Sequence, residues 1–366
     1  MKICSLFLLM AGLAAAGEPR ARNVILFLGD AGGIPTLHAA SLHGYGAPGK
    51  LFIQGMPHMG LSETSPVGAW VSDSAAGMTA IVTGQKTKNS VISQSAEAVP
   101  GKTDGAPLKT ILEYAEERGL STGVISNMSM ADATPAACYA HCNHRRKFAE
   151  IVAQIAKPRF GDGVDLVIGG GRKGILAATE SAGYDLRKAL GEKGYAWHDR
   201  PEEIPAGARR VVALFDERFD PLPVVRRAIE ILSRNPKGYF LMVEWDMHTD
   251  KLRQGLDQAV TMDKLVRQTA GQVNGRDTLL LFTADHSFDL RVRGGKPGEA
   301  LLPAEPAEPA EDSGRSAVQM FNTHTAEEVL VAAMGPGAAR VKGYMPNTQI
   351  FHILLAAYGW KETGKR

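Results

Sequence analysis

Short apolar runs alternate along this chain with longer segments whose apolar positions recur at helical spacing. The runs are rich in valine, isoleucine and leucine and carry no alternating polar face, which is typical of parallel strands buried on both sides. The predicted strands are Val24–Leu28, Gly123–Ser126, Val164–Ile168, Val211–Leu214, Phe240–Val243, Leu279–Thr283 and Val329–Ala332. The predicted helices are Leu108–Glu117, Pro135–His141, Val224–Leu232 and Leu252–Thr269. This alternation predicts an α/β fold, a doubly wound and mostly parallel sheet with helices on both faces in a three-layer sandwich.

Acidic residues and histidines follow three of the predicted strands. Asp30 follows the first strand, the segment EWDMHTD (residues 244–250) follows the fifth, and Asp285 with His286 follows the sixth. A single aspartate after a strand is usually a turn or cap residue. Three such clusters are hard to explain as turn or cap residues. The carboxyl ends of parallel strands meet at one edge of a sheet, and ligands bind there. We therefore expect these side chains to form one site.

The segment DSAAGMTAIVTG (residues 73–84) places Ser74 at the start of an apolar helix. Free backbone N–H groups and the positive end of the helix dipole favour an anion at that point. A hydroxyl group there could attack a phosphorus atom and hold the resulting phosphoryl group. Serine and aspartate are also preferred helix caps, so the segment alone fits an ordinary helix start as well. The clusters at the strand ends favour the catalytic interpretation.

Four side chains of types that bind metals recur at every second position: Glu244, Asp246, His248 and Asp250. If the strand continues, all four face one way and could serve two adjacent metals. Trp245 and Met247 would then lie on the opposite, apolar side. If the segment is helical, Glu244 pairs with His248 and Asp246 with Asp250 instead.

The types of ligand indicate which ions they bind. Imidazole with carboxylate suits zinc, whereas carboxylate, hydroxyl and water suit magnesium. Without cations, four carboxylates in a cleft of low dielectric constant would repel one another: Asp30, Glu244, Asp246 and Asp285. Three divalent cations would leave a surplus of two positive charges, which matches a phosphate dianion. We therefore expect the site to be malformed without metal.

The composition indicates how many domains the chain forms, and the first residues indicate where the protein is sent. The 366 residues are 44% hydrophobic with a net charge of +2, which suits one large globular domain or two smaller ones and indicates no nucleic-acid-binding face. Lys2 and the apolar run that ends at Ala16 predict a signal peptide over residues 1–16. A buried N-terminal strand is the alternative. The run is too short to span a bilayer, so we expect export to the periplasm or the extracellular medium and no transmembrane anchor.

Two cysteines, Cys138 and Cys142, lie beyond the predicted signal peptide. Their spacing corresponds to one helical turn, which is awkward for a disulfide. We expect them to be buried packing residues.

Several motifs, in this order, resemble those of the alkaline phosphatase family. They are NVILFLGDAGG, DSAAGMTAIVTGQKT, DATPAACYAHCNHRR, VDLVIGGGR, LLLFTADHS and FNTHT, and the resemblance runs from about Asn23 to about Leu355. The resemblance implies a secreted bacterial enzyme with two zinc ions and one magnesium ion. It also implies hydrolysis of small phosphate monoesters through a phosphoserine, and a homodimer. Residues 17–366 would form a single catalytic domain, with an acidic Pro/Ala-rich loop at about residues 302–316.

The resemblance also assigns roles at the second zinc and at the magnesium. Asp30 would bridge these two ions. Asp285 and His286 would complete the protein ligands of that zinc, with Ser74 joining as the nucleophile. The remaining magnesium ligands would be Thr134 and Glu244.

The first zinc is where the chain departs from the family pattern. The family has a glycine-rich run after the glutamate, whereas this chain has VEWD in a shorter segment. His324, in NTHT, is one ligand that the resemblance implies. We assign Asp246 and His248 as the others because their period-two spacing can converge on one ion, with Asp250 in reserve.

Arg145 is the residue that the resemblance assigns to the phosphate group, with Asp73 orienting it. Asp132 matches an acidic position near the magnesium's water shell. A bidentate guanidinium pairs with two oxygens of a dianion, which favours monoesters over diesters. The alternatives are a related two-zinc phosphodiesterase and a secreted protein that binds metal or phosphate without turnover.

Overall fold

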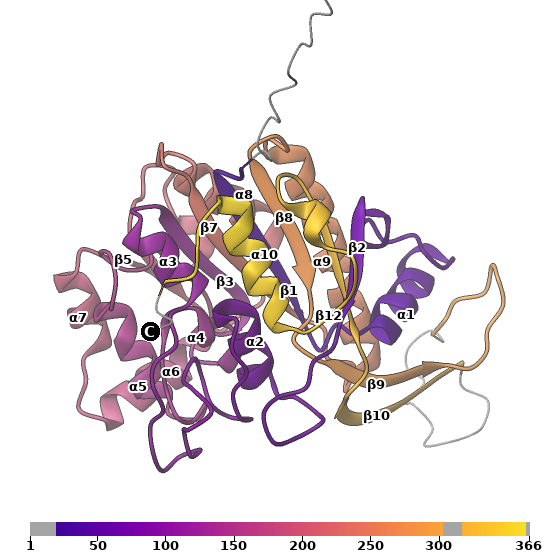
Figure 1. Cartoon of the computed structure of the whole chain (residues 1–366), viewed down its shortest axis with the longest axis horizontal. Helices are drawn as coiled ribbons and strands as arrows, with labels where there is room; N and C mark the ends of the chain where they lie inside the picture. The colour runs from indigo at the N-terminus through magenta and orange to yellow at the C-terminus, as the bar shows by residue number, and fades with distance from the viewer. Residues whose placement is uncertain (1–19, 303–316, 364–366) are drawn as a thin grey trace, which may run out of the picture.

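A ten-stranded sheet runs through the centre of the molecule, with helices packed on both of its faces (Figure 1). The computed structural model describes residues 20–302 and 317–363, so the predicted signal peptide and nearly all of the acidic loop lie outside the described residues. The strands of this sheet are β1 (Asn23–Asp30), β2 (His58–Ser62), β3 (Ser121–Ser129), β4 (Leu166–Gly170), β5 (Ala196–His198), β6 (Val211–Leu214), β7 (Tyr239–Asp246), β8 (Thr278–Thr283), β11 (Val329–Met334) and β12 (Gly343–Met345). Their order across the sheet is β12-β2-β11-β8-β1-β7-β3-β4-β6-β5.

All seven predicted strands form, and the mostly parallel sheet is confirmed. One prediction was wrong in direction, because β11 runs antiparallel to both β8 and β2. After β8 the chain makes a separate antiparallel ribbon of β9 (Ser287–Val292) and β10 (Val318–Thr325). The described residues between β8 and β11 contain no crossover helix, and a parallel return needs one. β11 therefore enters the sheet from the edge at which β8 ends.

The helices form two layers, each with its own apolar core. The helices are α1 (Ile34–Tyr45), α2 (Ser74–Thr83), α3 (Ile111–Glu117), α4 (Ala133–Tyr139), α5 (Phe148–Ala153), α6 (Arg172–Ser181), α7 (Leu186–Glu192), α8 (Pro221–Leu232), α9 (Leu252–Gln272) and α10 (Thr348–Tyr358). Alternate residues of β1 lie in different cores. Val24 and Leu26 pack in the core that lies toward α2, α3, α4 and α10. Ile25 and Phe27 pack toward α1, α8 and α9. This confirms the three-layer sandwich.

Local capping explains where the predicted helices begin. Thr110 and Glu113 form a capping box, in which each side chain accepts a hydrogen bond from the other's backbone N–H, so α3 begins at Ile111. Asp132 caps α4, which ends at Tyr139, and Cys142 therefore lies outside the helix. Both cysteines are buried and free.

The predictions missed the edge strands β5 and β12, the short strand β2 beside β12, and the ribbon strands β9 and β10. They also missed α1, α5, α6, α7 and α10. β2 alternates exposed and buried side chains over only five residues, so it lacks the continuous apolar run of a central strand. Within residues 20–302 and 317–363, no helix has the length and apolar character needed to cross a bilayer.

Candidate active site

The polar residues that follow the central strands lie together at one edge of the sheet. β1 lies between β7 and β8, and it ends at Asp30 beside Asp246 of β7. β8 ends at Thr283 and leads directly to Asp285 and His286. Three sequence-distant segments therefore bring their side chains to the same place, as their positions at parallel strand ends require.

Ser74 is positioned by the start of α2. Asp73 caps the helix, because its carboxylate accepts a hydrogen bond of 3.0 Å from the N–H of Ala76. The Ser74 hydroxyl is therefore not used for capping. It lies 3.5 Å from Asp30 Oδ2 and 3.3 Å from His286 Nε2, with only 2% of the residue exposed.

Asp30, Asp285 and His286 form a buried group that could hold a metal ion. His286 Nε2 lies 3.4 Å from Asp30 Oδ1 and 3.5 Å from Asp285 Oδ2. Those two carboxylate oxygens have no hydrogen-bond partner among the described residues. Burial and the charge of Asp30 raise the pKa of Asp285 well above its usual value, and burial lowers the pKa of His286. A bound cation would compensate these buried carboxylates.

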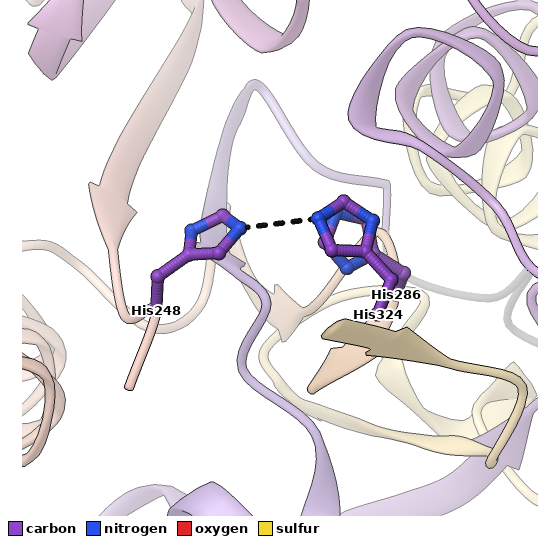
Figure 2. A group of neighbouring side chains, drawn as sticks. All are labelled: His248, His286 and His324. Carbon is purple, nitrogen blue, oxygen red and sulfur yellow. Dashed lines mark hydrogen bonds between the residues drawn. The ribbon is translucent and has the colours of Figure 1, made fainter. Parts of the chain in front are cut away.

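Three imidazoles meet beside this group, and Figure 2 shows them converging from separate segments: His248, His286 and His324. The Nε2 atoms of His248 and His324 are 3.4 Å apart, and the His286 and His324 rings stack at 3.8 Å. In each ring the Nδ1 atom contacts a different acceptor. The acceptors are Asp246 for His248, the Ser287 carbonyl for His286 and the Ser72 carbonyl for His324. Each ring can thus direct its Nε2 lone pair toward a metal.

Glu244 and Thr134 are buried, and their oxygen atoms are of the type that binds magnesium. Glu244 accepts a hydrogen bond from Ser126, but its Oε1 has no partner within the described chain, and neither has Thr134 Oγ1. Burial and then the charge of Asp30 raise the pKa of Glu244 well above its usual value. Oxygen ligands of this kind suit a hard divalent cation.

Arg145 is held between two carboxylates. Its guanidinium donates to Asp73 Oδ2 at 3.3 Å and to Asp132 Oδ1 at 2.8 Å. Burial disfavours the charged form, but the carboxylates of Asp132 and Asp73 outweigh it and raise the pKa of Arg145. Asp132 also accepts a hydrogen bond from the N–H of Ala133, so it contacts the arginine and caps α4.

The segment after Glu244 is neither one continuous strand nor a helix. β7 ends at Asp246, and His248 and Asp250 lie in the following loop. Trp245 and Met247 are buried in the apolar core, as the alternating pattern predicts. Asp250 is exposed and lines a cleft of about 560 Å³ together with Asp246, His248 and His324.

Sequence reasoning missed two residues that contact this site. Ser126 donates to Glu244, and Asn127 accepts a hydrogen bond from the backbone N–H of Asp246 at 2.8 Å. Both lie in β3, next to β7. Ser126 could have been found from the sequence, because it is a polar residue at the end of the predicted strand Gly123–Ser126.

The site and the fold together define a class of enzyme. An α/β sheet that gathers carboxylates, imidazoles and a helix-start serine at its carboxyl edge is suited to hydrolysis of an anionic ester. A family model described as alkaline phosphatase matches residues 21–198 and 221–321, which is more than half of the chain. The chain belongs to the alkaline phosphatase family, whose members are metal-dependent, and it is a phosphoric monoester hydrolase.

Individual relatives and solved structures agree with this family. The chain is 30% identical over 347 residues to an alkaline phosphatase of Gadus morhua, covering 78% of this chain and 73% of that protein. It is 28% identical over 421 residues to streptomycin-6-phosphate phosphatase of Streptomyces griseus, covering 94% and 92%. The fold is similar to that of the alkaline phosphatase from the Antarctic bacterium TAB5, with a TM-score of 0.77, 23% identity, and 94% and 100% of the two chains covered. A variant of that enzyme is described with magnesium bound.

Proposed function

We propose that this enzyme hydrolyses phosphate monoesters through a phosphoserine formed on Ser74, with two zinc ions and one magnesium ion. One observation carries the proposal. The side chains that we expect to bind the metals carry buried oxygen atoms with no hydrogen-bond partner among the described residues: Asp30 Oδ1, Asp285 Oδ2, Glu244 Oε1 and Thr134 Oγ1. The Ser74 hydroxyl lies 3.5 Å from the other carboxylate oxygen of Asp30. Unpaired buried carboxylate oxygens cost several kcal/mol in order of magnitude, unless a cation or proton binds them.

The donor groups divide into three sets. Asp246, His248 and His324 would hold the first zinc, with Asp250 in reserve, and all four line one cleft. Asp30, Asp285 and His286 would hold the second zinc beside Ser74. The magnesium ligands would be Asp30, Glu244 and Thr134. Bound zinc would lower the pKa of the serine hydroxyl and stabilise the charge that develops on the leaving alcohol oxygen.

The protein's own groups would bind the phosphate and direct the attack. Ser74 Oγ attacks phosphorus, the P–O bond to the alcohol breaks on the opposite side, and the alcohol leaves. Water then cleaves the phosphoserine and releases inorganic phosphate. The N–H groups at the start of α2 favour the phosphate charge, and Arg145 would bind two of the phosphate oxygens. A monoester dianion matches this guanidinium better than a diester monoanion does.

Two further expectations accompany this proposal. Residues 1–16 predict a signal peptide, so we expect the enzyme to act after export. The relation to streptomycin-6-phosphate phosphatase spans 94% of the chain, which makes streptomycin 6-phosphate a worthwhile substrate to test beside simple phosphate monoesters.

The test is to trap the phosphoserine. Enzyme given ³²P-labelled monoester is quenched in acid, and the labelled residue is identified by peptide mapping. We expect the label on Ser74 and none in Ser74→Ala, whose turnover should fall by a factor on the order of 10³ or more. Ser72→Ala is the matched control, because among the described residues the Ser72 side chain donates only to the neighbouring Asp73 carbonyl. Chelation of divalent ions should abolish turnover, and zinc with magnesium should restore it.

Three outcomes would contradict the proposal. Full turnover without label on Ser74 would exclude the phosphoserine. Faster hydrolysis of bis-nitrophenyl phosphate than of nitrophenyl phosphate would identify a diesterase. Phosphate binding without turnover would identify a binding protein.

A further inference from the structure

We propose that Asn89 and Ser90 are positioning residues, which form a turn that fixes where Arg145 lies relative to Ser74. The inference rests on the proposed function, in which Ser74 attacks phosphorus and Arg145 binds oxygens of the same phosphate group. The Asn89–Ser90 turn lies in the loop that follows α2, and both of its residues are half-buried. Neither belongs to a group that could hold a metal ion, so the turn acts through the residues that it contacts.

Ser90 contacts both catalytic segments through its own backbone. Its N–H donates to Asp73 Oδ2 at 2.9 Å, and its carbonyl accepts a hydrogen bond of 2.8 Å from the backbone N–H of Arg145. Asp73 Oδ2 also accepts a hydrogen bond of 3.3 Å from the Arg145 guanidinium. The three residues are therefore joined in a closed ring of hydrogen bonds, which includes the cap of α2 and both ends of the arginine.

The backbone of Ser90 has a conformation that serine rarely adopts. Its φ is +71°, in the left-handed region that favours glycine. Strained conformations of this kind persist where the surrounding bonds determine them, and they concentrate at active sites. A change to negative φ would rotate the N–H of Ser90 relative to its carbonyl. The residue could then not keep its bonds to Asp73 and Arg145 together.

Asn89 holds the chain just before Ser74. Its Oδ1 accepts a hydrogen bond of 3.0 Å from the Asp73 N–H, and its Nδ2 donates to the Val71 carbonyl at 3.0 Å. The Asp73 N–H lies before the first turn of α2, so the helix offers it no carbonyl. An amide side chain can accept one of these bonds and donate the other. Asn89 thus fixes how the chain enters α2.

The loop that carries the turn is anchored on two sides. Ile92 and Cys142 exchange backbone hydrogen bonds of 2.8 and 2.9 Å, which tie the loop to the segment that leads to Arg145. The N–H of Ser93 donates to Thr79 Oγ1 of α2 at 2.9 Å. The turn is therefore a firm link between the helix of the nucleophile and the arginine. A displacement of about 1 Å between two catalytic groups can cost on the order of 100-fold in rate.

The first test compares Asn89→Ala with Asn235→Ala, with zinc and magnesium saturating. Asn235 also bridges two backbone groups, since it donates to the Gly119 carbonyl at 2.9 Å and accepts from the Lys237 N–H at 3.0 Å. It precedes β7, whose other end leads to the site. Asn89→Ala should lower kcat/KM for nitrophenyl phosphate by about 10- to 100-fold and raise the inhibition constant of inorganic phosphate by about 10-fold. Asn235→Ala should leave both unchanged.

A double-mutant cycle separates positioning from a general loss of stability. In an Arg145→Ala background there is no guanidinium to misplace, so Asn89→Ala should lower kcat/KM by less than about 3-fold. Ser90 supplies an independent pair of variants. Ser90→Gly keeps both backbone bonds at positive φ, so its kcat/KM should stay within about 2-fold of the unchanged enzyme. Ser90→Val disfavours that φ and should lose about as much as Asn89→Ala.

Three outcomes would overturn the inference. They are equal losses of activity in Asn89→Ala and Asn235→Ala, an equal effect of Asn89→Ala with and without the Arg145 guanidinium, and a Ser90→Val enzyme as active as Ser90→Gly. If Ser90→Val does not fold, the cycle on Asn89 decides. Failure of the proposed function is distinguishable, because the unchanged enzyme would then form no phosphoserine, or Arg145→Ala alone would leave phosphate binding unchanged.

Discussion

Arg145 illustrates how single residues at this site depend on one another. Its guanidinium contacts Asp73, which caps the helix of Ser74, and Asp132, which caps α4. The arginine thus links the starts of α2 and α4 and presents a positive charge where the phosphate is expected. A lysine has the charge but lacks the planar fork that can reach both carboxylates.

We expect Arg145→Lys to lower kcat/KM for phosphate monoesters by about 10- to 100-fold, because charged hydrogen bonds of about 1.5–3 kcal/mol are lost. The loss for a diester should be smaller, so the ratio of the two substrates measures the effect. Arg146→Lys is the matched control, because Arg146 is the exposed neighbour and its replacement should leave both rates unchanged. An equal loss for both substrates would show that the arginine does not select monoesters.

At this scale the sequence predicted which residues gather but not which atoms meet. Resemblance placed Arg145 beside Asp73, and the structure agrees. The bond from Arg145 to Asp132 and the bond from Asp246 to His248 were not predictable, because spacing fixes the face of a side chain and not its partner.

Among the elements, α2 shows how closely a helix must approach the sheet edge. A Cβ added at Gly77 would lie 2.5 Å from the backbone oxygen of Asp285. α2 can bring Ser74 to the carboxylates only because this position lacks a side chain.

Gly77→Ala should therefore destabilise the protein and lower turnover, although alanine ordinarily favours a helix by about 1 kcal/mol over glycine. The displaced Asp285 backbone would also weaken zinc binding, which a titration can measure. Gly174→Ala in α6 is the matched control, since no described atom beyond the neighbouring backbone of the same helix lies within 4 Å of the added methyl group. It should raise the free energy of unfolding by about 0.5–1 kcal/mol. A Gly77→Ala enzyme as stable and active as the unchanged protein would contradict this view of α2.

Strand prediction succeeded where burial on both faces produces continuous apolar runs. It failed for β5 and β12 at the sheet edges and for β2 beside β12, where the runs are short or interrupted. The direction of β11 was also not predictable, because it depends on whether a crossover helix precedes the strand.

Across the whole molecule, a second group of buried acids lies at the far end of β3 from Ser126. Glu116 is 4% exposed and accepts hydrogen bonds from Thr122 and from the N–H of Gly163 at 3.0 Å. Burial raises the pKa of Glu116 to about 7 and that of nearby Asp165 to about 6. These acids are remote from the site, so they bear on stability and not on catalysis.

The raised pKa of Glu116 predicts how stability changes with pH. The folded protein holds this proton up to about pH 7, whereas the unfolded chain releases it near pH 4.5. The contribution of Glu116 to the free energy of unfolding is therefore fully present below pH 4.5. It falls by up to about 3 kcal/mol as pH rises toward 7. Between pH 5 and 8, the free energy of unfolding should therefore fall less for Glu116→Gln than for the unchanged protein. Urea unfolding at each pH, with zinc and magnesium saturating, measures this difference.

Glu117→Gln serves as the control for this measurement. Its side chain is more exposed, and hydrogen bonding to Lys109 lowers its pKa, so it titrates below this range. Its stability should follow that of the unchanged protein from pH 5 to 8. Identical curves for Glu116→Gln and the unchanged protein would show that Glu116 is ionised in the folded state at pH 5.

The position of β1 at the centre of the sheet affects how the chain can fold while it is being made. Val24 pairs with Phe240 and Asn23 with Thr278, so the first strand synthesised has no neighbour until most of the protein has left the ribosome. At about 5–20 residues per second, that delay is on the order of 10 s or more. During this time its apolar side chains have no sheet to join, so we expect the nascent chain to stay open to aggregation.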